Sequence, residues 1–176
     1  MLNHKITEFA LSCARGRIER AKSIGVHLSR EEFRYDDYMG FRFACVSGEL
    51  EIAKWMHKRF NLTADVVRLR DNWCIKQACE NNHIKLAKWL VDTFELTKGD
   101  ISAGNNFAFW SACYADSIDT AKWLVEVLNL TRDDMNKCGK RVNPFGIACE
   151  YENVKIKQWL MQDFGFNDGD IGPLNS

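Results

Sequence analysis

The sequence has little proline, no excess of either charge and no long apolar run. Only two prolines occur among its 176 residues, and no stretch rich in glycine and serine has the composition of a flexible linker. The 24 basic residues equal the 24 acidic ones, so the chain as a whole has no field that attracts nucleic acid or an anionic membrane. Its apolar runs are a few residues long, whereas a transmembrane helix needs about 20. We therefore expect a single domain over residues 1–176, without membrane insertion and without nucleic acid as its main partner.

A secretory signal is also missing from the sequence. Residues 1–20 have no apolar segment followed by a cleavage site, which predicts a protein of the cytoplasm or the nucleus. In such a reducing compartment the seven cysteines are expected to remain thiols and to pack as small apolar side chains.

What the sequence does contain is a repeat. An Ala-Cys pair recurs at intervals of 34, 34 and 36 residues, and each pair is followed ten residues later by a tryptophan. The cysteines are Cys45, Cys79, Cys113 and Cys149, and the tryptophans are Trp55, Trp89, Trp123 and Trp159. A weaker copy precedes them, with Cys13 and with Ser23 in place of tryptophan. The five copies cover approximately residues 4–34, 35–68, 69–102, 103–138 and 139–172.

Each copy has the apolar spacing of two amphipathic helices. In the fourth copy, Phe109, Ala112 and Cys113 share one helical face, and residues 118–128 carry a second apolar stripe. Gly16, Gly48 and Asn82 stand between the two helices of their copies and tolerate the left-handed conformation that ends a helix. One such pair cannot bury its apolar face alone, so we expect the pairs to stack into a rod on the order of 40–50 Å long.

A second recurring signal follows four of the five helix pairs. A capping residue stands three positions before an acid in Ser29…Glu32, Thr97…Asp100, Thr131…Asp134 and Asn167…Asp170. This spacing predicts a short capped helical turn at each site. A plain polar loop is the alternative.

These features together resemble the ankyrin repeat. Phe109 and its equivalents take the leucine position of the ankyrin signature, Pro144 keeps the proline, Gly16 and Gly48 keep the glycine, and His83 keeps the final histidine. The signature histidine is replaced throughout, by Ala10, Arg42, Lys76, Trp110 and Gly146. The Ala-Cys, Ala-Lys-Trp-Leu and Asn-Leu-Thr segments look more like the divergent ankyrin arrays abundant in large DNA viruses and some protists.

The resemblance implies an all-α, ankyrin-like helical solenoid of five helix-pair repeats, in which short capped helical turns replace the usual β-hairpin fingers. It also implies protein binding through the inner helices and fingers, with no shared catalytic residues. A viral or parasite factor that binds a host protein is one form that such a function takes.

The cysteines and histidines do not have the spacing of a metal or catalytic site. The recurring cysteines occupy one position per copy, so their sulfurs should lie about 10 Å apart, too far to share a zinc ion or a disulfide. Cys74 and Cys138 lie off this register, and a reactive thiol at either is the alternative to simple packing. The histidines, His4, His27, His57 and His83, share no helix face. We expect no cofactor, no small-molecule substrate and no enzymatic activity.

A row of lysines recurs in the second helices. It comprises Lys22, Lys54, Lys88 and Lys122. Acids such as Glu51, Asp119 and Glu126 stand three residues before or four after members of the row, which favours a solvated outer face with ion pairs inside each helix. Binding of nucleic acid or anionic lipid through this row is the alternative function.

Some first-helix positions differ from copy to copy, and an ankyrin-like array would turn them towards its concave face. They hold Arg42, Phe43 and Val46, then Lys76, Gln77 and Glu80, then Trp110, Ser111 and Tyr114, then Gly146, Ile147 and Glu150. Aromatic residues are enriched in binding hot spots, and Trp110 and Tyr114 share one helix face. We predict that a protein partner binds Arg42, Phe43, Lys76, Gln77, Trp110 and Tyr114. Packing of the aromatics against a neighbouring finger is the alternative.

The last copy has no polar closing helix, so a monomer and an end-to-end assembly are both compatible with the sequence.

Overall fold

The computed structural model describes residues 2–136 and 143–171. Cys138, the boundary between the fourth and fifth sequence copies, and the end of the fifth copy at residue 172 lie outside these ranges.

The described residues form helices and contain no β-strand, so the all-α prediction is confirmed. Within these residues, ten helices form five consecutive pairs. The pairs are α1 (Leu2–Ala14) with α2 (Ile18–Gly25), α3 (Arg30–Ser47) with α4 (Leu50–Phe60), α5 (Ala64–Glu80) with α6 (Ile84–Phe94), α8 (Ala103–Tyr114) with α9 (Ile118–Leu128), and α11 (Pro144–Glu150) with α12 (Val154–Phe164). The short helices α7 (Lys98–Ile101) and α10 (Arg132–Asn136) and a 3-10 turn at Asp168–Asp170 complete the described part of the chain.

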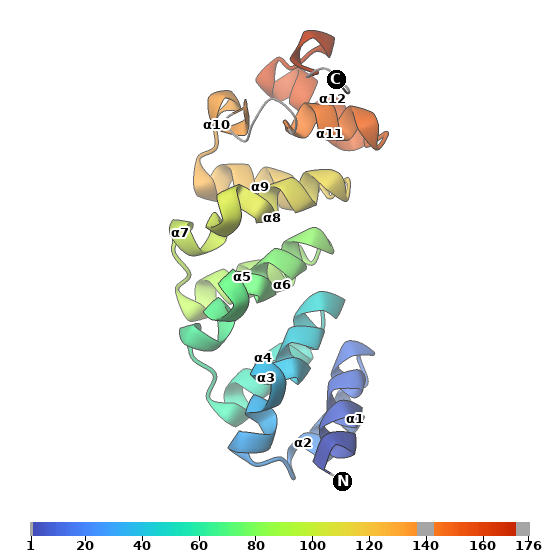
Figure 1. Ribbon diagram of the computed structural model, residues 1–176, viewed down its shortest axis with the longest axis vertical. Helices are drawn as coiled ribbons and strands as arrows, with labels where there is room; N and C mark the ends of the chain where they lie inside the picture. Colours follow the sequence, from blue (N-terminus) through green and yellow to red (C-terminus); the bar gives the residue numbers. More distant parts are fainter. Residues whose placement is uncertain (1, 137–142, 172–176) are drawn as a thin grey trace.

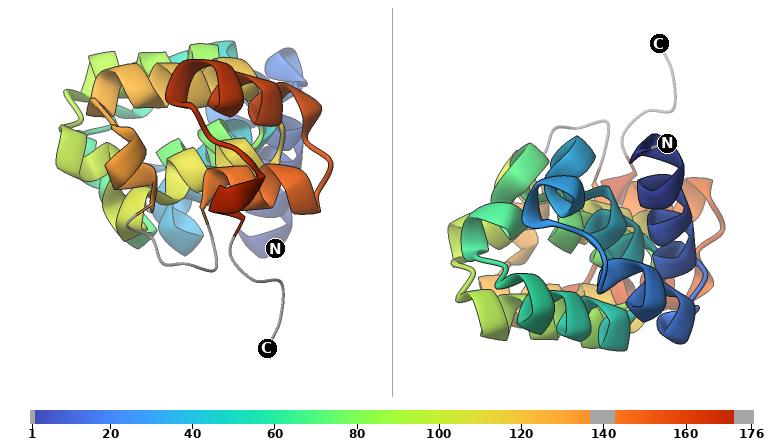
Figure 2. Two further views of the ribbon diagram at one scale, coloured as in Figure 1. Left: turned by 90° about the horizontal axis from the view of Figure 1, so that it is seen from above. Right: turned by 90° about the horizontal axis from the view of Figure 1, so that it is seen from below.

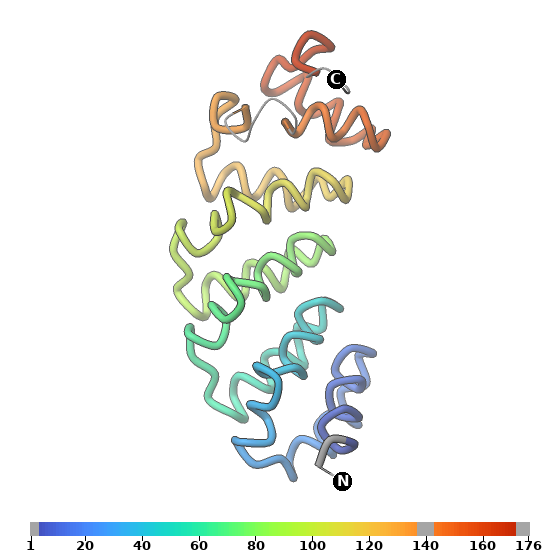
Figure 3. Tube along the Cα trace, viewed as in Figure 1, coloured from blue at the N-terminus to red at the C-terminus, as the bar shows by residue number. Residues whose placement is uncertain are grey.

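The pairs stack along the long axis of the molecule (Figure 1). The first helix of each pair contacts the first helix of the next, so that α1, α3, α5, α8 and α11 follow one another in contact. The view along the stack in Figure 2 shows the pairs superimposed, and the trace in Figure 3 shows α7 and α10 along one edge of the stack. The core is therefore a column that runs through the stack and is not centred on any one pair.

The recurring cysteines and tryptophans pack within this column, as predicted. Cys13, Cys45, Cys79 and Cys113 are fully buried and Cys149 is half-buried. The ring of Trp55 lies 6.4 Å from that of Phe9 in the preceding pair, measured between centroids. The ring of Trp89 lies 6.1 Å from that of His57, again in the preceding pair. These side chains join neighbouring pairs, so their recurrence reflects packing.

The break between the two helices of a pair also joins neighbours. Gly16, Gly48 and Asn82 are left-handed there, as predicted. The ring of His83, the residue before α6, lies with Nε2 2.9 Å from the carbonyl oxygen of Val46 in the preceding pair. Asn153 holds the equivalent position before α12, and its amide donates to the carbonyl oxygens of Cys113 and Tyr114, both at 2.8 Å. These bonds satisfy carbonyls that the end of a helix leaves without a helical partner.

The short segments that follow each pair are called fingers below and comprise residues 29–38, 63–72, 97–106, 131–136 and 167–171. The first two contain the first turns of α3 and α5, which non-helical residues at 35–38 and 69–72 separate from the rest of each helix. The predicted caps are present. Capping boxes join Ser29 with Glu32, Thr97 with Asp100 and Asn167 with Asp170, and Thr131 exchanges hydrogen bonds with Asp134. The prediction of capped helical turns is therefore confirmed in these four fingers. In the finger at 63–72, Val66 takes the place of the acid and Thr63 makes no side-chain cap bond.

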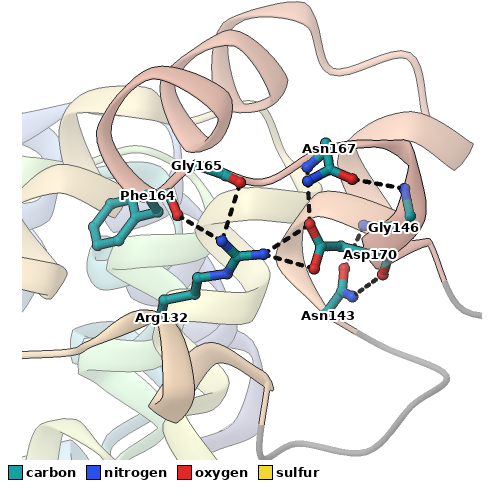
Figure 4. Close-up of polar contacts among 8 residues, drawn as sticks. Arg132, Asn143, Gly146, Phe164, Gly165, Asn167 and Asp170 are labelled. Atoms are coloured by element: carbon teal, nitrogen blue, oxygen red, sulfur yellow. Dashed lines mark hydrogen bonds and ion pairs between the residues drawn. The ribbon is translucent and has the colours of Figure 1, made fainter.

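At two junctions, arginine–carboxylate pairs connect one finger to the next. Arg68 Nε donates to Asp100 Oδ1 at 2.9 Å, and its terminal nitrogen donates to Oδ2 at 3.0 Å. Arg132 donates to both oxygens of Asp170, at 2.7 and 2.9 Å, and also to the carbonyl oxygens of Phe164 and Gly165 (Figure 4). In each case the carboxylate that caps one finger also receives a guanidinium from the finger before it.

The Asp100 pair predicts a pH-dependent contribution to stability. The Arg68 guanidinium and the Thr97 cap lower the pKa of Asp100 from 3.8 to about 2. A carboxyl with a lowered native pKa stabilises the fold fully above its unfolded pKa, and the contribution is lost as the pH falls through the native one. We expect Asp100→Asn to lower the free energy of unfolding by about 1 kcal/mol at pH 7, since it removes the charge from a cap and an ion pair.

The measurement is urea denaturation of wild type and Asp100→Asn at pH 7, 4 and 2. The difference in the free energy of unfolding between the two proteins should be constant above about pH 4 and should shrink between pH 4 and pH 2. Asp92→Asn, at an exposed site of α6, is the matched control. An unchanged difference at pH 2 would contradict the assignment.

Candidate binding surface

Each described finger up to residue 106 ends in a turn of three consecutive left-handed residues. They are residues 36–38, 70–72 and 104–106, with φ between 46° and 69°. A left-handed residue with a side chain costs about 1–2 kcal/mol, least for asparagine and aspartate. Asp36, Asp37, Asp71, Asn72, Asn105 and Asn106 supply most of these positions, together with Gly104. The turns direct the chain from the finger into the first helix of the next pair.

Three of the predicted partner-binding residues hold these turns. Arg42 donates to the carbonyl oxygens of Asp36 at 2.8 Å and Asp37 at 3.1 Å. At the equivalent position of the next pair, the ammonium of Lys76 lies 2.5 Å from Asp71 Oδ2. At the position after that, Trp110 Nε1 donates to the carbonyl oxygen of Asn105 at 3.0 Å.

Arg42 and Lys76 also bridge to the next pair. The guanidinium of Arg42 lies 5.3 Å from the ring centroid of Trp73, and the ammonium of Lys76 lies 5.6 Å from that of Phe107. Arg70 completes the contact between these fingers by pairing with Asp36 at 3.0 Å and Asp37 at 2.9 Å. Arg42 and Lys76 are each only 8% exposed. Both charges are thus paired with carboxylates of the same chain, and little of either side chain faces solvent.

Phe43 and Gln77 are half-buried. The amide of Gln77 donates to Glu80 at 2.7 Å, one turn along the same helix.

Tyr114 is the predicted site residue that is most exposed, at 52% of its surface. Its ring meets that of Tyr151, which is 49% exposed, edge to face with centroids 4.5 Å apart. The charge of Glu150 and the neighbouring Tyr114 raise the pKa of Tyr151, so the hydroxyl of Tyr151 is neutral at pH 7. The structure therefore brings two aromatic rings from successive pairs together on the surface. The comparison of copies missed Tyr151 because its equivalents, Ser47, Asn81 and Ala115, are small or polar.

The cysteines remain thiols in the described part of the chain. Burial raises the pKa of Cys79 to about 12, so this thiol is protonated and unreactive at neutral pH. Cys74 is 2% exposed, which favours packing over the reactive alternative, whereas Cys138 lies outside the described residues. Across residues 2–136 and 143–171, no three or more His, Cys, Asp or Glu side chains gather closely enough to hold a metal ion.

The lysine row lies on the second helices and is partly neutralised there. Lys22 pairs with Glu19 at 3.3 Å and Lys54 pairs with Glu51 at 2.9 Å, each within its own helix. Lys88 and Lys122 are exposed. Half of the row thus forms the pairs expected of a solvated outer face.

None of the helices in the described ranges combines the length and the apolar character that crossing a bilayer requires.

Comparison of the chain with models of protein families and with curated proteins finds no match.

The two aromatic residues of the predicted site should respond differently to truncation. Trp110→Ala removes the bond that holds the left-handed turn at residues 104–106 and a half-buried ring, so we expect the free energy of unfolding to fall by about 2 kcal/mol. Tyr114→Ala removes an exposed ring and should cost less than about 1 kcal/mol. Chemical denaturation of the two variants measures both values. Equal losses would contradict the division between a structural Trp110 and an accessible Tyr114.

Proposed function

We propose that this chain is a protein-interaction module, an ankyrin-like solenoid of five helix-pair repeats that binds a protein partner in the cytoplasm or the nucleus. The observation that carries the proposal is the Tyr114–Tyr151 pair, two half-exposed rings held against each other at the junction of α8 and α11. Tyrosine offers a large contact area with few rotatable bonds, which makes such a pair a suitable anchor for a partner.

The contrast between the recurring residues, which pack the pairs together, and the two tyrosines supports this proposal. Cysteines, phenylalanines and tryptophans that recur in the copies pack the pairs together, and the His83 and Asn153 contacts join them at the turns. The pair of tyrosines has no such task, because both rings retain about half of their surface and occur in only one junction. Exposed aromatic side chains without a packing role are typical of binding surfaces.

The backbone of each tyrosine is fixed, which favours recognition by a preformed surface. The amide of Asn153 donates to the carbonyl oxygen of Tyr114, and Tyr151 ends α11 with its backbone N–H bonded to the carbonyl oxygen of Ile147. A partner that covers both rings therefore meets side chains whose main chain is already ordered, and the entropy lost on binding is small.

The test is affinity capture followed by quantitative mass spectrometry, with Tyr114→Ala/Tyr151→Ala beside the wild type. Met161→Ala, at a residue of α12 that is 45% exposed, is the matched control for loss of exposed apolar surface. We expect proteins that the wild type and the control retain to be depleted at least about tenfold by the tyrosine double variant, since hot-spot residues contribute about 2 kcal/mol or more. Identical partner sets for all three proteins would sink the proposed surface.

Binding to nucleic acid or anionic lipid through the lysine row gives a different result in the same assay. Phosphate binding weakens steeply between 50 and 200 mM salt, because each neutralised phosphate releases counterions. The tyrosine-dependent proteins should stay bound across this range.

A further inference from the structure

One junction between fingers contains two arginines that lack a carboxylate partner. A cleft of about 370 Å³ lies between the finger at 29–38 and the finger at 63–72. Arg30 and Arg34 line it together with the rings of Phe33, Tyr38 and Phe60. Both arginines are exposed, and neither guanidinium forms a hydrogen bond or an ion pair with a described residue.

Arginines at the equivalent positions of other fingers show which contacts these two positions can make. Arg34 stands five residues after its cap, as Arg68 does, and Arg68 binds the capping carboxylate of the next finger, Asp100. Arg30 stands one residue after its cap, as Arg132 does in a later finger. Arg132 likewise binds the capping carboxylate of the next finger, Asp170. Arg30 and Arg34 thus both occupy positions that bind a carboxylate in the following finger.

That carboxylate is missing at this junction because the position holds Val66. Thr63 consequently makes no side-chain cap bond, unlike Ser29, Thr97 and Asn167. Asp65 also lines the cleft, but among the described residues it forms no ion pair with either arginine. Two guanidinium groups therefore border an open cleft beside apolar side chains, at a place where the same fold elsewhere seats an acid.

We propose that the cleft between these fingers binds an acidic segment of a protein partner, with an aspartate or glutamate carboxylate taking the role that Asp100 and Asp170 play at the other junctions. The guanidinium plane matches a carboxylate bidentately, as Arg68 does with Asp100. The rings of Phe33, Tyr38 and Phe60 offer an apolar floor for the residue beside the acid. This inference rests on the proposed function, since it describes the chemistry of the partner.

The test uses the full chain labelled with 15N and a synthetic peptide, acetyl-Ser-Phe-Glu-Asp-Phe-Ser-amide. The Nε–H signals of the arginine side chains report directly on carboxylate binding. We expect the signals of Arg30 and Arg34 to shift saturably with this peptide and not with its glutamine–asparagine counterpart. Shifts no larger than those of the exposed Arg15 and Arg17 would overturn the proposal.

Val66→Asp tests the comparison between junctions. Its carboxylate should pair with Arg34 and accept a hydrogen bond from the backbone N–H of Thr63. Without peptide, the Arg34 signal should therefore move towards that of Arg68. The peptide affinity should fall at least about tenfold. Val154→Asp, at an exposed site of α12, adds the same charge elsewhere and should bind as the wild type does. Arg34→Gln, which leaves the core untouched, should weaken binding to a similar degree. Wild-type affinity in both Val66→Asp and Arg34→Gln would contradict the proposal.

Two further arms separate the sources of failure. A phosphoserine peptide that shifts Arg30 and Arg34 when the acidic peptide does not would overturn the proposal in favour of phosphate binding. The Tyr114→Ala/Tyr151→Ala protein should retain peptide binding. If it does so but captures the same proteins as the wild type, the tyrosine surface fails while the cleft assignment stands.

Discussion

A helix pair with helices of about eleven residues cannot bury its own apolar stripe, and the rest of the structure depends on this constraint. The buried cysteines and phenylalanines of one pair need the next pair to cover them, and Trp55 and Trp89 cover residues of the pair before. Burial between pairs therefore fixes the order and spacing of the stack. Every other feature, including the fingers and their charges, is placed by that spacing.

The fingers join successive pairs through polar contacts, in addition to the apolar contacts of the core. Each left-handed turn carries a conformational cost, and a side chain one turn into the following helix offsets it by bonding to the turn. Arg42 and Trp110 do this with different chemistry at equivalent positions. The guanidinium–carboxylate contacts of Arg68 and Arg132 then fix each finger to the next. Disturbing one finger should therefore affect its neighbour as well as its own pair.

The features predicted correctly from the sequence are those that recur with the same residue type. The spacing of cysteine and tryptophan predicts the packing positions, and the Thr97…Asp100 spacing predicts the capped turn, because helical period and capping chemistry are local. The left-handed turns were not predicted, since the triplet at residues 70–72 shares few side chains with that at 104–106. The signal was present in their aspartate, asparagine and glycine content, which tolerates that conformation.

The candidate surface was predicted less well, for a physical reason. Variation among copies predicts positions without a structural role. Arg42, Lys76 and Trp110 differ in type, yet each bonds to the left-handed turn before its helix. A guanidinium, an ammonium and an indole each bond to the turn at this position, so the residue type varies although the task is shared. Tyr151 could not be singled out from the sequence because its equivalents are small or polar, and only the fold brings its ring against that of Tyr114.

A position in the repeat becomes informative when the residue that it contacts in the next finger is known. Arg34 and Arg68 are the same residue at equivalent positions, so comparing them directly reveals nothing. Their difference lies in the next finger, where Asp100 faces Arg68 but Val66 stands beside the cleft that Arg34 lines. An unpaired charge in a fold that pairs its equivalent elsewhere has no structural role to explain it. In a repeat protein, such a broken pair is a stronger indication of a binding site than variation at a single position.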